Sequence, residues 1–151
     1  MITIEEFKKK HSNKARFVGL DLGSKRIGVS ICDERQSIAT PFKTINKTNT
    51  IELIEMLKTV IKENNIKGII IGNPINMDGS LGRSAQSVND VASNISKSID
   101  LPVILWDERL STVGAFKLSG QLDINVSKRV KTIDQNAAAF ILQGAIDYLN
   151  N

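Results

Sequence analysis

The sequence has little of what several common kinds of active site require. It contains one cysteine, Cys32, and one histidine, His11, among 151 residues. A single cysteine cannot form an intramolecular disulfide or a cysteine-based zinc site. A Ser-His-Asp or Cys-His centre would have to use His11, and nothing in the polar segment around it supports such a centre. The first two kinds of site are therefore excluded, and histidine-based catalysis is disfavoured.

Aromatic residues and long apolar runs are also scarce. Aromatic residues make up 5% of the chain, so extended base-stacking surfaces are not expected. No apolar run approaches the ~20 residues that a membrane-spanning helix needs. The N-terminal segment has no signal-peptide core, and Thr3 with Glu6 fits a capping box that starts a short helix. We therefore expect a cytoplasmic protein that does not enter a membrane.

What is present fits an ordinary globular protein. Hydrophobic residues make up 41% of the chain and charged residues 24%, which is typical of such proteins. We expect one domain over residues 1–151, because this length supports a single sizeable core. The net charge of +4 permits a nucleic-acid partner, but a modest basic excess does not require one.

Hydrophobic periodicity predicts alternating strands and helices after an opening run of three strands. Strands are expected at 16–23, 26–33, 37–45, 68–72 and 103–106. Helices are expected at 51–61, 88–99, 112–118 and 134–149. Thr50 is the predicted N-cap of the first of these helices. This order predicts a mixed sheet flanked by helices, and ligands on such sheets gather at the carboxyl ends of neighbouring parallel strands.

Acidic residues occur at three places beside sequence that reads as buried. Asp21 lies in an apolar strand, Asp107 and Glu108 follow the last strand, and Asp134 begins an apolar helical stripe. A carboxylate next to a core is costly unless something neutralises it. Three such places suggest a shared cation, as in metal-dependent phosphodiester chemistry.

Each acid also has a purely structural explanation. Asp21 could cap a hairpin turn, and Asp134 could be the N-cap of the final helix. The segment of Asp107 and Glu108 could be a turn held by a salt bridge to Arg109. Alternatively, one of these two acids faces the metal while the other pairs with Arg109, because successive strand residues point to opposite faces.

Two segments, one a polar loop and one a basic cluster, could meet phosphate groups. Residues 72–84 form a long polar loop, and Arg83 with the helix N-terminus behind it could hold a phosphate. The alternative is a surface connector with Ser80 or Ser84 as the helix cap. Lys128, Arg129 and Lys131 suit a polyanion backbone, or else form a solvated loop.

The aspartate turn at 21–23 also occurs in actin-like ATPases, but those proteins need two such domains, and this chain is too short for both.

Four motifs in register carry a family resemblance. They are Gly19-Leu20-Asp21-Leu22-Gly23 with Arg26-Ile27-Gly28, Gly72-Asn73-Pro74 with Asn76-Met77-Asp78-Gly79-Ser80, Asp107-Glu108-Arg109-Leu110-Ser111-Thr112, and Asp134 with Ala137-Ala138. With them, the chain resembles the YqgF family of pre-16S rRNA nucleases, also called Holliday-junction-resolvase-like. The resemblance covers most of residues 16–149.

The resemblance implies an α/β, ribonuclease-H-like fold with a mixed five-stranded sheet of strand order 3-2-1-4-5, flanked by helices. By matching motif, Asp21 looks like the central metal ligand. Asp107 or Glu108, together with Asp134, look like the remaining catalytic acids. Many relatives carry an acid at the end of the fourth strand, where this chain has Asn73. We therefore favour Glu108 as the substitute, which gives Asp21, Glu108 and Asp134 as the metal ligands.

The first functional hypothesis is a metal-dependent endonuclease that processes the 5′ side of pre-16S rRNA. Two Mg²⁺ or Mn²⁺ ions, roughly 3.5–4 Å apart, would bind between the carboxylates. The basic residues expected to contact nucleic acid are Lys25, Arg26, Arg83, Arg109, Lys128, Arg129 and Lys131.

Two other hypotheses remain open from the sequence. Resolution of four-way DNA junctions needs two active sites and therefore a dimer, and the chain could be a monomer or a homodimer. A non-catalytic ribosome-assembly factor would bind RNA through the same basic edge, with a salt-sensitive affinity that does not depend on Asp21.

Overall fold

The computed structural model describes residues 1–10, 14–75, 78–110 and 126–151, and for residues 126–135 it describes the backbone alone. The expected helix at 112–118 lies outside the described residues. In chain order the elements are α1 (Ile4–Lys10), β1 (Arg16–Leu22), β2 (Arg26–Cys32), β3 (Ala39–Asn46), α2 (Thr50–Asn64), β4 (Ile66–Asn73), α3 (Arg83–Ser98), β5 (Val103–Asp107), the short 3₁₀-helix η1 (Glu108–Leu110) and α5 (Val126–Leu149).

The strands form one mixed sheet with the order β3-β2-β1-β4-β5. The first three strands are antiparallel neighbours, as expected of a meander. The crossover through α2 makes β4 parallel to β1, and the crossover through α3 makes β5 parallel to β4. The predicted fold class and the strand order 3-2-1-4-5 are therefore confirmed.

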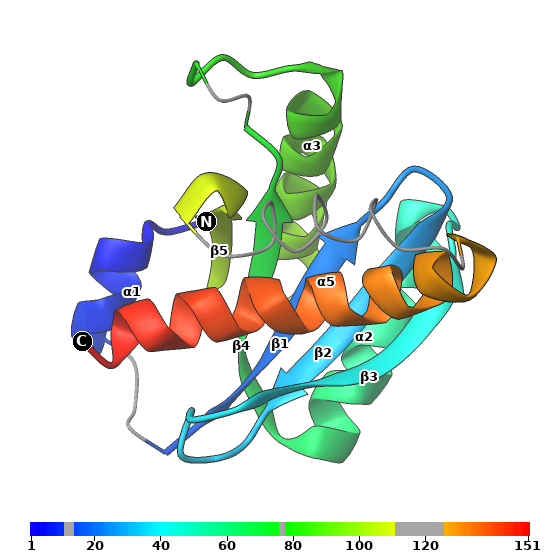
Figure 1. Ribbon diagram of the computed structural model, residues 1–151. Helices are drawn as coiled ribbons and strands as arrows, with labels where there is room; N and C mark the ends of the chain where they lie inside the picture. Colours follow the sequence, from blue (N-terminus) through cyan, green and yellow to red (C-terminus); the bar gives the residue numbers. More distant parts are fainter. Residues whose placement is uncertain (11–13, 76–77, 111–125) are drawn as a thin grey trace.

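Helices cover the sheet on both sides (Figure 1). The long helix α5 crosses one side, with α1 beside its C-terminal end, and we call this side the α5 face. Helices α2 and α3 cover the other side, the α2/α3 face. Alternation along the strands fills both layers, because Phe17 belongs to the core under α5 while Val18 and Leu20 belong to the core under α2 and α3. The central strands are thus buried on both faces.

Two contacts fix α5 against the middle of the sheet. The hydroxyl of Ser30 donates a hydrogen bond to the carbonyl oxygen of Ala138 at 2.7 Å. A Cβ atom on Gly19 would lie 2.5 Å from Oγ of Ser30 and 2.7 Å from Cβ of Leu142. Only glycine lets the helix approach β1 this closely. These contacts set the position of α5 over β1, the strand that ends in Asp21.

The N-caps of α1 and α2 can be compared with the caps predicted from the sequence. The backbone amide of Glu6 donates to Oγ1 of Thr3 at 3.1 Å, which confirms the predicted cap of α1. The predicted cap of α2 was wrong by one residue: Asn49, not Thr50, is the N-cap, and its Oδ1 accepts from the amide of Glu52 at 2.9 Å. Thr50 is already the first residue of the helix. Asparagine caps helices at least as well as threonine, and Asn49 comes one residue earlier.

Strand β3 tolerates Pro41 because it lies at the edge of the sheet. The register between β2 and β3 shifts between Val29 and Ser30, where Ser30 pairs with Pro41. A proline that cannot donate to a ladder is accepted at such an edge or bulge. None of the helices in the described part of the chain is long and apolar enough to cross a membrane.

Candidate active site

The three parallel strands end at the same edge of the sheet, which we call the carboxyl edge. Asp21 is the last residue but one of β1, Asn73 ends β4, and Asp107 ends β5. Asn73 and Asp107 are register partners. Two of the three acidic segments found in the sequence therefore meet at one edge, as ligand sites on such sheets do.

Asp21 lies on the α5 face of the carboxyl edge. It alternates with Phe17 and Gly19, which both face α5, and it is partly buried. The chain then turns tightly, because the amide of Gly23 donates to the carbonyl of Asp21 at 3.1 Å. A Cβ atom on Gly23 would lie 2.6 Å from the carbonyl oxygen of Arg26. Glycine at this position lets β1 stop directly after the aspartate.

Glu108 reaches the same face from β5. A Cβ atom on Gly72 would lie 3.4 Å from the carboxyl carbon of Glu108 and 2.4 Å from Cδ1 of Ile141 on α5. The carboxyl group of Glu108 therefore lies against the bare backbone of β4, next to α5. The register of β1 with β4 pairs Leu20 with Ile71, so Asp21 continues beside Gly72, about 4.8 Å away across the ladder. Asp21 and Glu108 thus flank Gly72.

Asp107 has a different environment. Its carboxylate forms a salt bridge to the guanidinium of Arg109, with Oδ2 at 2.7 Å from Nη2, and Nε of Arg109 donates to Oδ1 at 3.0 Å. The hydrogen bonds from this guanidinium hold the pKa of Asp107 below its ordinary value. The same pairing raises the pKa of Arg109. Asp107 therefore pairs with Arg109.

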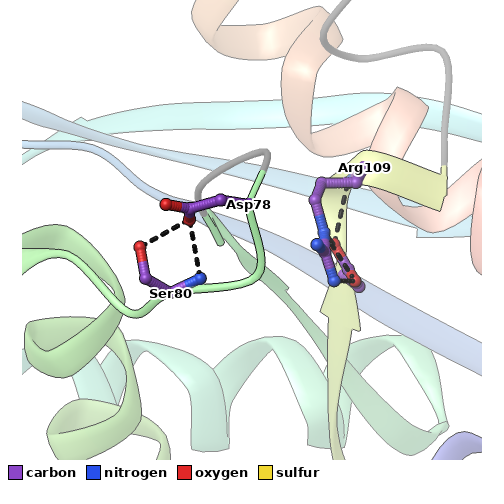
Figure 2. Close-up of polar contacts among 4 residues, drawn as sticks. Asp78, Ser80 and Arg109 are labelled. Atoms are coloured by element: carbon purple, nitrogen blue, oxygen red, sulfur yellow. Dashed lines mark hydrogen bonds and ion pairs between the residues drawn. The ribbon is translucent and has the colours of Figure 1, made fainter.

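The loop after β4 comes close to this pair (Figure 2). Asp78 accepts hydrogen bonds from the amide and the hydroxyl of Ser80, at 2.9 Å and 2.6 Å. These bonds, more than the nearby charge of Arg109, lower the pKa of Asp78. Gly79 has a φ of +87°, and a Cβ atom there would lie 3.6 Å from Nη1 of Arg109. The loop therefore turns at Gly79 over the guanidinium.

Asn73, the last residue of β4, is 8% exposed. Its Oδ1 atom is buried and has no hydrogen-bond partner among the described residues. Such an atom is uncommon, because buried polar groups are normally paired. By alternation Asn73 faces α2 and α3, whereas Gly72 and Ile70 face α5. The orphaned oxygen adds a neutral acceptor to the carboxyl edge.

The third acid lies on α5, but the helix begins earlier than predicted. It starts at Val126, eight residues before the expected start at Asp134. Asp134 is therefore inside the helix, and the explanation of this residue as an N-cap was wrong. It precedes Ala138 by one helical turn, and Ala138 packs over Gly19. The side chain of Asp134 lies outside the described residues.

Within the side chains that the structure describes, no three or more His, Cys, Asp or Glu residues form a group that could hold a metal ion. Asp21 and Glu108 are the described pair on the α5 face, and the expected third ligand is the undescribed Asp134. Sequence reasoning missed Gly72, which leaves room for the carboxyl group of Glu108. The signal was present as a glycine that closes a β-branched run.

The expected phosphate contacts are spread along the same edge. Lys25 is exposed in the turn between β1 and β2, Arg26 begins β2, and Arg83 begins α3. Arg109 is engaged by Asp107. The side chains of Lys128, Arg129 and Lys131 lie outside the described residues, although their backbone is part of α5.

The chain matches known proteins over most of its length. A family model described as "RuvX: Holliday junction resolvase" matches residues 15–148. The chain belongs to this family. The resemblance that the four motifs carry is thereby confirmed.

Two relatives align with most or all of the chain. A protein from Pelagibacter ubique is 87% identical over 151 residues, which is 100% of both chains. A protein from Rhodobacter capsulatus is 46% identical over 132 residues, covering 87% of this chain and 82% of its own. Both carry the name "Putative pre-16S rRNA nuclease".

A solved structure of Thermus thermophilus RuvC in complex with a Holliday junction substrate shares the fold of this RuvX-family chain. Its TM-score is 0.54 at 10% identity, and the match covers 89% of this chain and 94% of that chain. At this identity the match shows the fold, which is ribonuclease-H-like.

Proposed function

We propose that this RuvX-family chain is a metal-dependent endonuclease that acts in 5′ processing of pre-16S rRNA. The observation that carries the proposal is the pair of carboxylates, Asp21 and Glu108, on both sides of Gly72 at the carboxyl edge. The names of the relatives that are 87% and 46% identical support pre-16S rRNA as the substrate. We also propose a cytoplasmic location, because the names of these relatives imply an rRNA substrate.

The residues at this edge fit a divalent metal. Carboxylate oxygens are the ligands that Mg²⁺ and Mn²⁺ prefer. The missing side chain at Gly72 leaves space beside the carboxyl group of Glu108 that a Cβ atom would occupy. Asp21, Glu108 and Asp134 would hold the metal, and two ions would suit phosphodiester chemistry. When bound, the metal supplies activation of water and stabilisation of the charge that develops on the phosphate.

The protein's own residues position the substrate. Lys25, Arg26 and Arg83 lie around the ends of β1 and the start of α3, where they can contact backbone phosphates on either side of the acids. Asp107 holds Arg109 in a fixed geometry, so that the charge of the acid next to Glu108 is paired within the protein. The α5 face keeps the catalytic acids beside a packed helix, which limits their motion.

The experiment compares Asp21→Asn with wild type on a pre-16S 5′-leader RNA, with Mn²⁺ or with EDTA. Wild type should cleave the RNA with Mn²⁺ and not with EDTA, and Asp21→Asn should lose at least about a hundredfold in rate. Asp90→Asn is the matched control, because Asp90 is an exposed residue of α3. Equal rates for Asp21→Asn and wild type would refute the proposal. RNA binding by both proteins, with cleavage by neither, would favour the assembly factor.

Resolution of four-way DNA junctions is the second candidate. It is favoured by the description of the family model that matches residues 15–148. Junction cleavage needs two active sites, so this activity predicts a stable homodimer. A DNA junction assayed beside the leader RNA, with sedimentation of the same protein sample, distinguishes the two. A monomer that cuts only RNA removes the second candidate.

A further inference from the structure

A cavity opens on the α2/α3 face directly behind the carboxyl edge. Its volume is about 250 Å³, and its walls come from the end of β1, the start of β2, the segment before α2, and the first turns of α3. The backbone amide of Lys47 donates to the carbonyl of Lys25 at 2.8 Å, which joins the two loops that form one wall. The cavity is therefore built from segments that are distant in the sequence.

The floor of the cavity is apolar. It consists of Leu22, Ile27, Leu53, Val88 and Val91. Ile27, Leu53 and Val88 are at most 4% exposed, so the floor belongs to the core under α2 and α3. A flat, weakly polar group would bury apolar surface there, and burial of this kind favours binding.

The rim of the cavity is basic and rich in hydroxyl groups. Lys47 and Arg83 line it together with Ser24, Ser84 and Ser87, and no described lining residue is acidic. Neither Ser80 nor Ser84 caps α3, contrary to the cap expected from the sequence. The N-cap is Gly82, no side chain caps the first turn, and that turn carries no acid. The positive end of the helix dipole and two cations therefore face the mouth, which suits a phosphate.

The cavity and the acids adjoin each other through the end of β1. Asp21 lies on the α5 face and Leu22, the next residue, lines the cavity. Their Cα atoms are about 3.8 Å apart. A strand of nucleic acid whose phosphate lies at Asp21 can therefore place a neighbouring nucleotide at the cavity.

We propose that this cavity binds the base and phosphate of one unpaired nucleotide next to the scissile phosphate. The proposal rests on the proposed function and names the feature of the substrate that the protein would recognise. The apolar floor takes the face of the base, and Arg83 with the first turn of α3 takes its phosphate. The volume of about 250 Å³ is below the roughly 300–1,000 Å³ of typical ligand sites, so it suits one base and not two.

The test measures binding of uridine monophosphate by NMR in EDTA, so that no metal and no cleavage take part. Saturable shifts are expected for the methyl groups of Leu53 and Val88, and not for Ile141 and Leu142 on the α5 face. Uridine alone and inorganic phosphate alone should each bind at least about tenfold more weakly than the mononucleotide. If these shifts are seen but the protein has no nuclease activity in the Mn²⁺ assay, the proposed function is refuted and the nucleotide site is still supported.

Three variants separate the cavity from the rest of the surface. Ser87→Trp fills the mouth of the cavity from an exposed position of α3. It should weaken the binding of uridine monophosphate at least about tenfold. Ser98→Trp is the matched control, because Ser98 is exposed on the same helix and does not line the cavity. Arg83→Gln should lower the affinity for uridine monophosphate, while the affinity for uridine stays unchanged.

Four results would overturn the inference. They are the absence of saturable shifts, shifts confined to the α5 face, inorganic phosphate that binds as tightly as the mononucleotide, and undiminished binding by Ser87→Trp with a wild-type-like spectrum. If the Ser87→Trp protein fails to fold, Arg83→Gln decides the test instead, because the side chain of Arg83 is exposed and is not part of the core. If Arg83→Gln binds the mononucleotide as wild type does, the phosphate contact is wrong.

Discussion

The two faces of the sheet differ most at the carboxyl edge. On the α5 face, Asp21 and Glu108 lie on both sides of Gly72. On the α2/α3 face, Asp107 at the end of β5 is neutralised by Arg109, and the cavity beside the end of β1 has a basic rim. Alternation along the strands makes this separation. One edge of the sheet therefore holds carboxylates on one face and a basic rim on the other.

Neutralising the two adjacent acids one at a time should have the largest effect on activity. Glu108→Gln should lower the rate of RNA cleavage at least about a hundredfold, because its carboxyl group lies on the α5 face. Asp107→Asn should lower it less than about tenfold, because that carboxylate binds Arg109. Single-turnover rates with Mn²⁺ measure both. The reverse order would mean that the two faces exchange roles.

A second effect concerns the approach of α5. Gly19→Ala should lower the free energy of unfolding by about 1–3 kcal/mol, because its Cβ atom overlaps Ser30 and Leu142. It should also lower the cleavage rate per folded molecule, because α5 moves away from the strand of Asp21. Chemical denaturation and an activity assay on the same sample check both parts.

Gly68→Ala provides the control for this glycine. Its Cβ atom would lie 3.0 Å from ring atoms of Phe17 and Phe7, at the opposite end of β4 from the carboxyl edge. It should lower stability while the rate per folded molecule stays at the wild-type value. Equal losses of rate in both variants would show that stability alone, and not the position of α5, controls activity.

A smaller effect is expected at Gly72. A Cβ atom there meets Cδ1 of Ile141 at 2.4 Å, which is the far end of a flexible side chain and can turn away. Gly72→Ala should therefore cost less than about 1 kcal/mol of stability, but it should weaken Mn²⁺ binding by crowding Glu108. Ile141→Val removes Cδ1, so the double variant should recover stability and not metal affinity. Recovery of both would place the metal elsewhere.

The smallest expected effect is the pH dependence of the Asp107–Arg109 pair. The folded-state pKa of Asp107 is lower than its ordinary value of 3.8, because Arg109 binds the charged form. The pair therefore stabilises the fold above pH ~4, and this contribution is lost as the pH falls through the lower, folded-state pKa. Asp107→Asn should lower the Tm by a few degrees at most at neutral pH and not at all in strong acid, since the pair is partly exposed. A constant difference at every pH would rule out this charge pairing.

The fold could be predicted from the sequence to a large extent. Apolar runs such as the one from Gly68 to Gly72 gave the strands, and the change from paired strands to alternating strands and helices gave the mixed sheet. The order of the strands came from the four motifs. These features are local or belong to the family, and both kinds are visible in one sequence.

The start of α5 could not be predicted in the same way. Asp134 is a good N-cap residue, and the basic residues before it resemble a loop, so the helix was expected to begin there. Lysine and arginine have favourable helix propensities, and the helix begins at Val126. A capping residue inside a helix and one at its start look alike in the sequence.

The direction of the acids after β5 also depended on the tertiary structure. Alternation predicts that Asp107 and Glu108 point to opposite faces, but not which of the two lies beside α5. The turn into η1 and the bare backbone at Gly72 place the carboxyl group of Glu108 beside α5. The cavity behind the edge was not predicted at all, because its floor comes from β1, β2, α2 and α3.

Mn²⁺ binding followed by electron paramagnetic resonance tests the central claim most directly. We expect wild type to bind Mn²⁺, and Asp21→Asn, Glu108→Gln and Asp134→Asn each to weaken that binding at least about tenfold. Asp90→Asn and Asp107→Asn should bind as wild type does. Undiminished affinity in the first three variants would mean that the acids of β1, η1 and α5 hold no common cation.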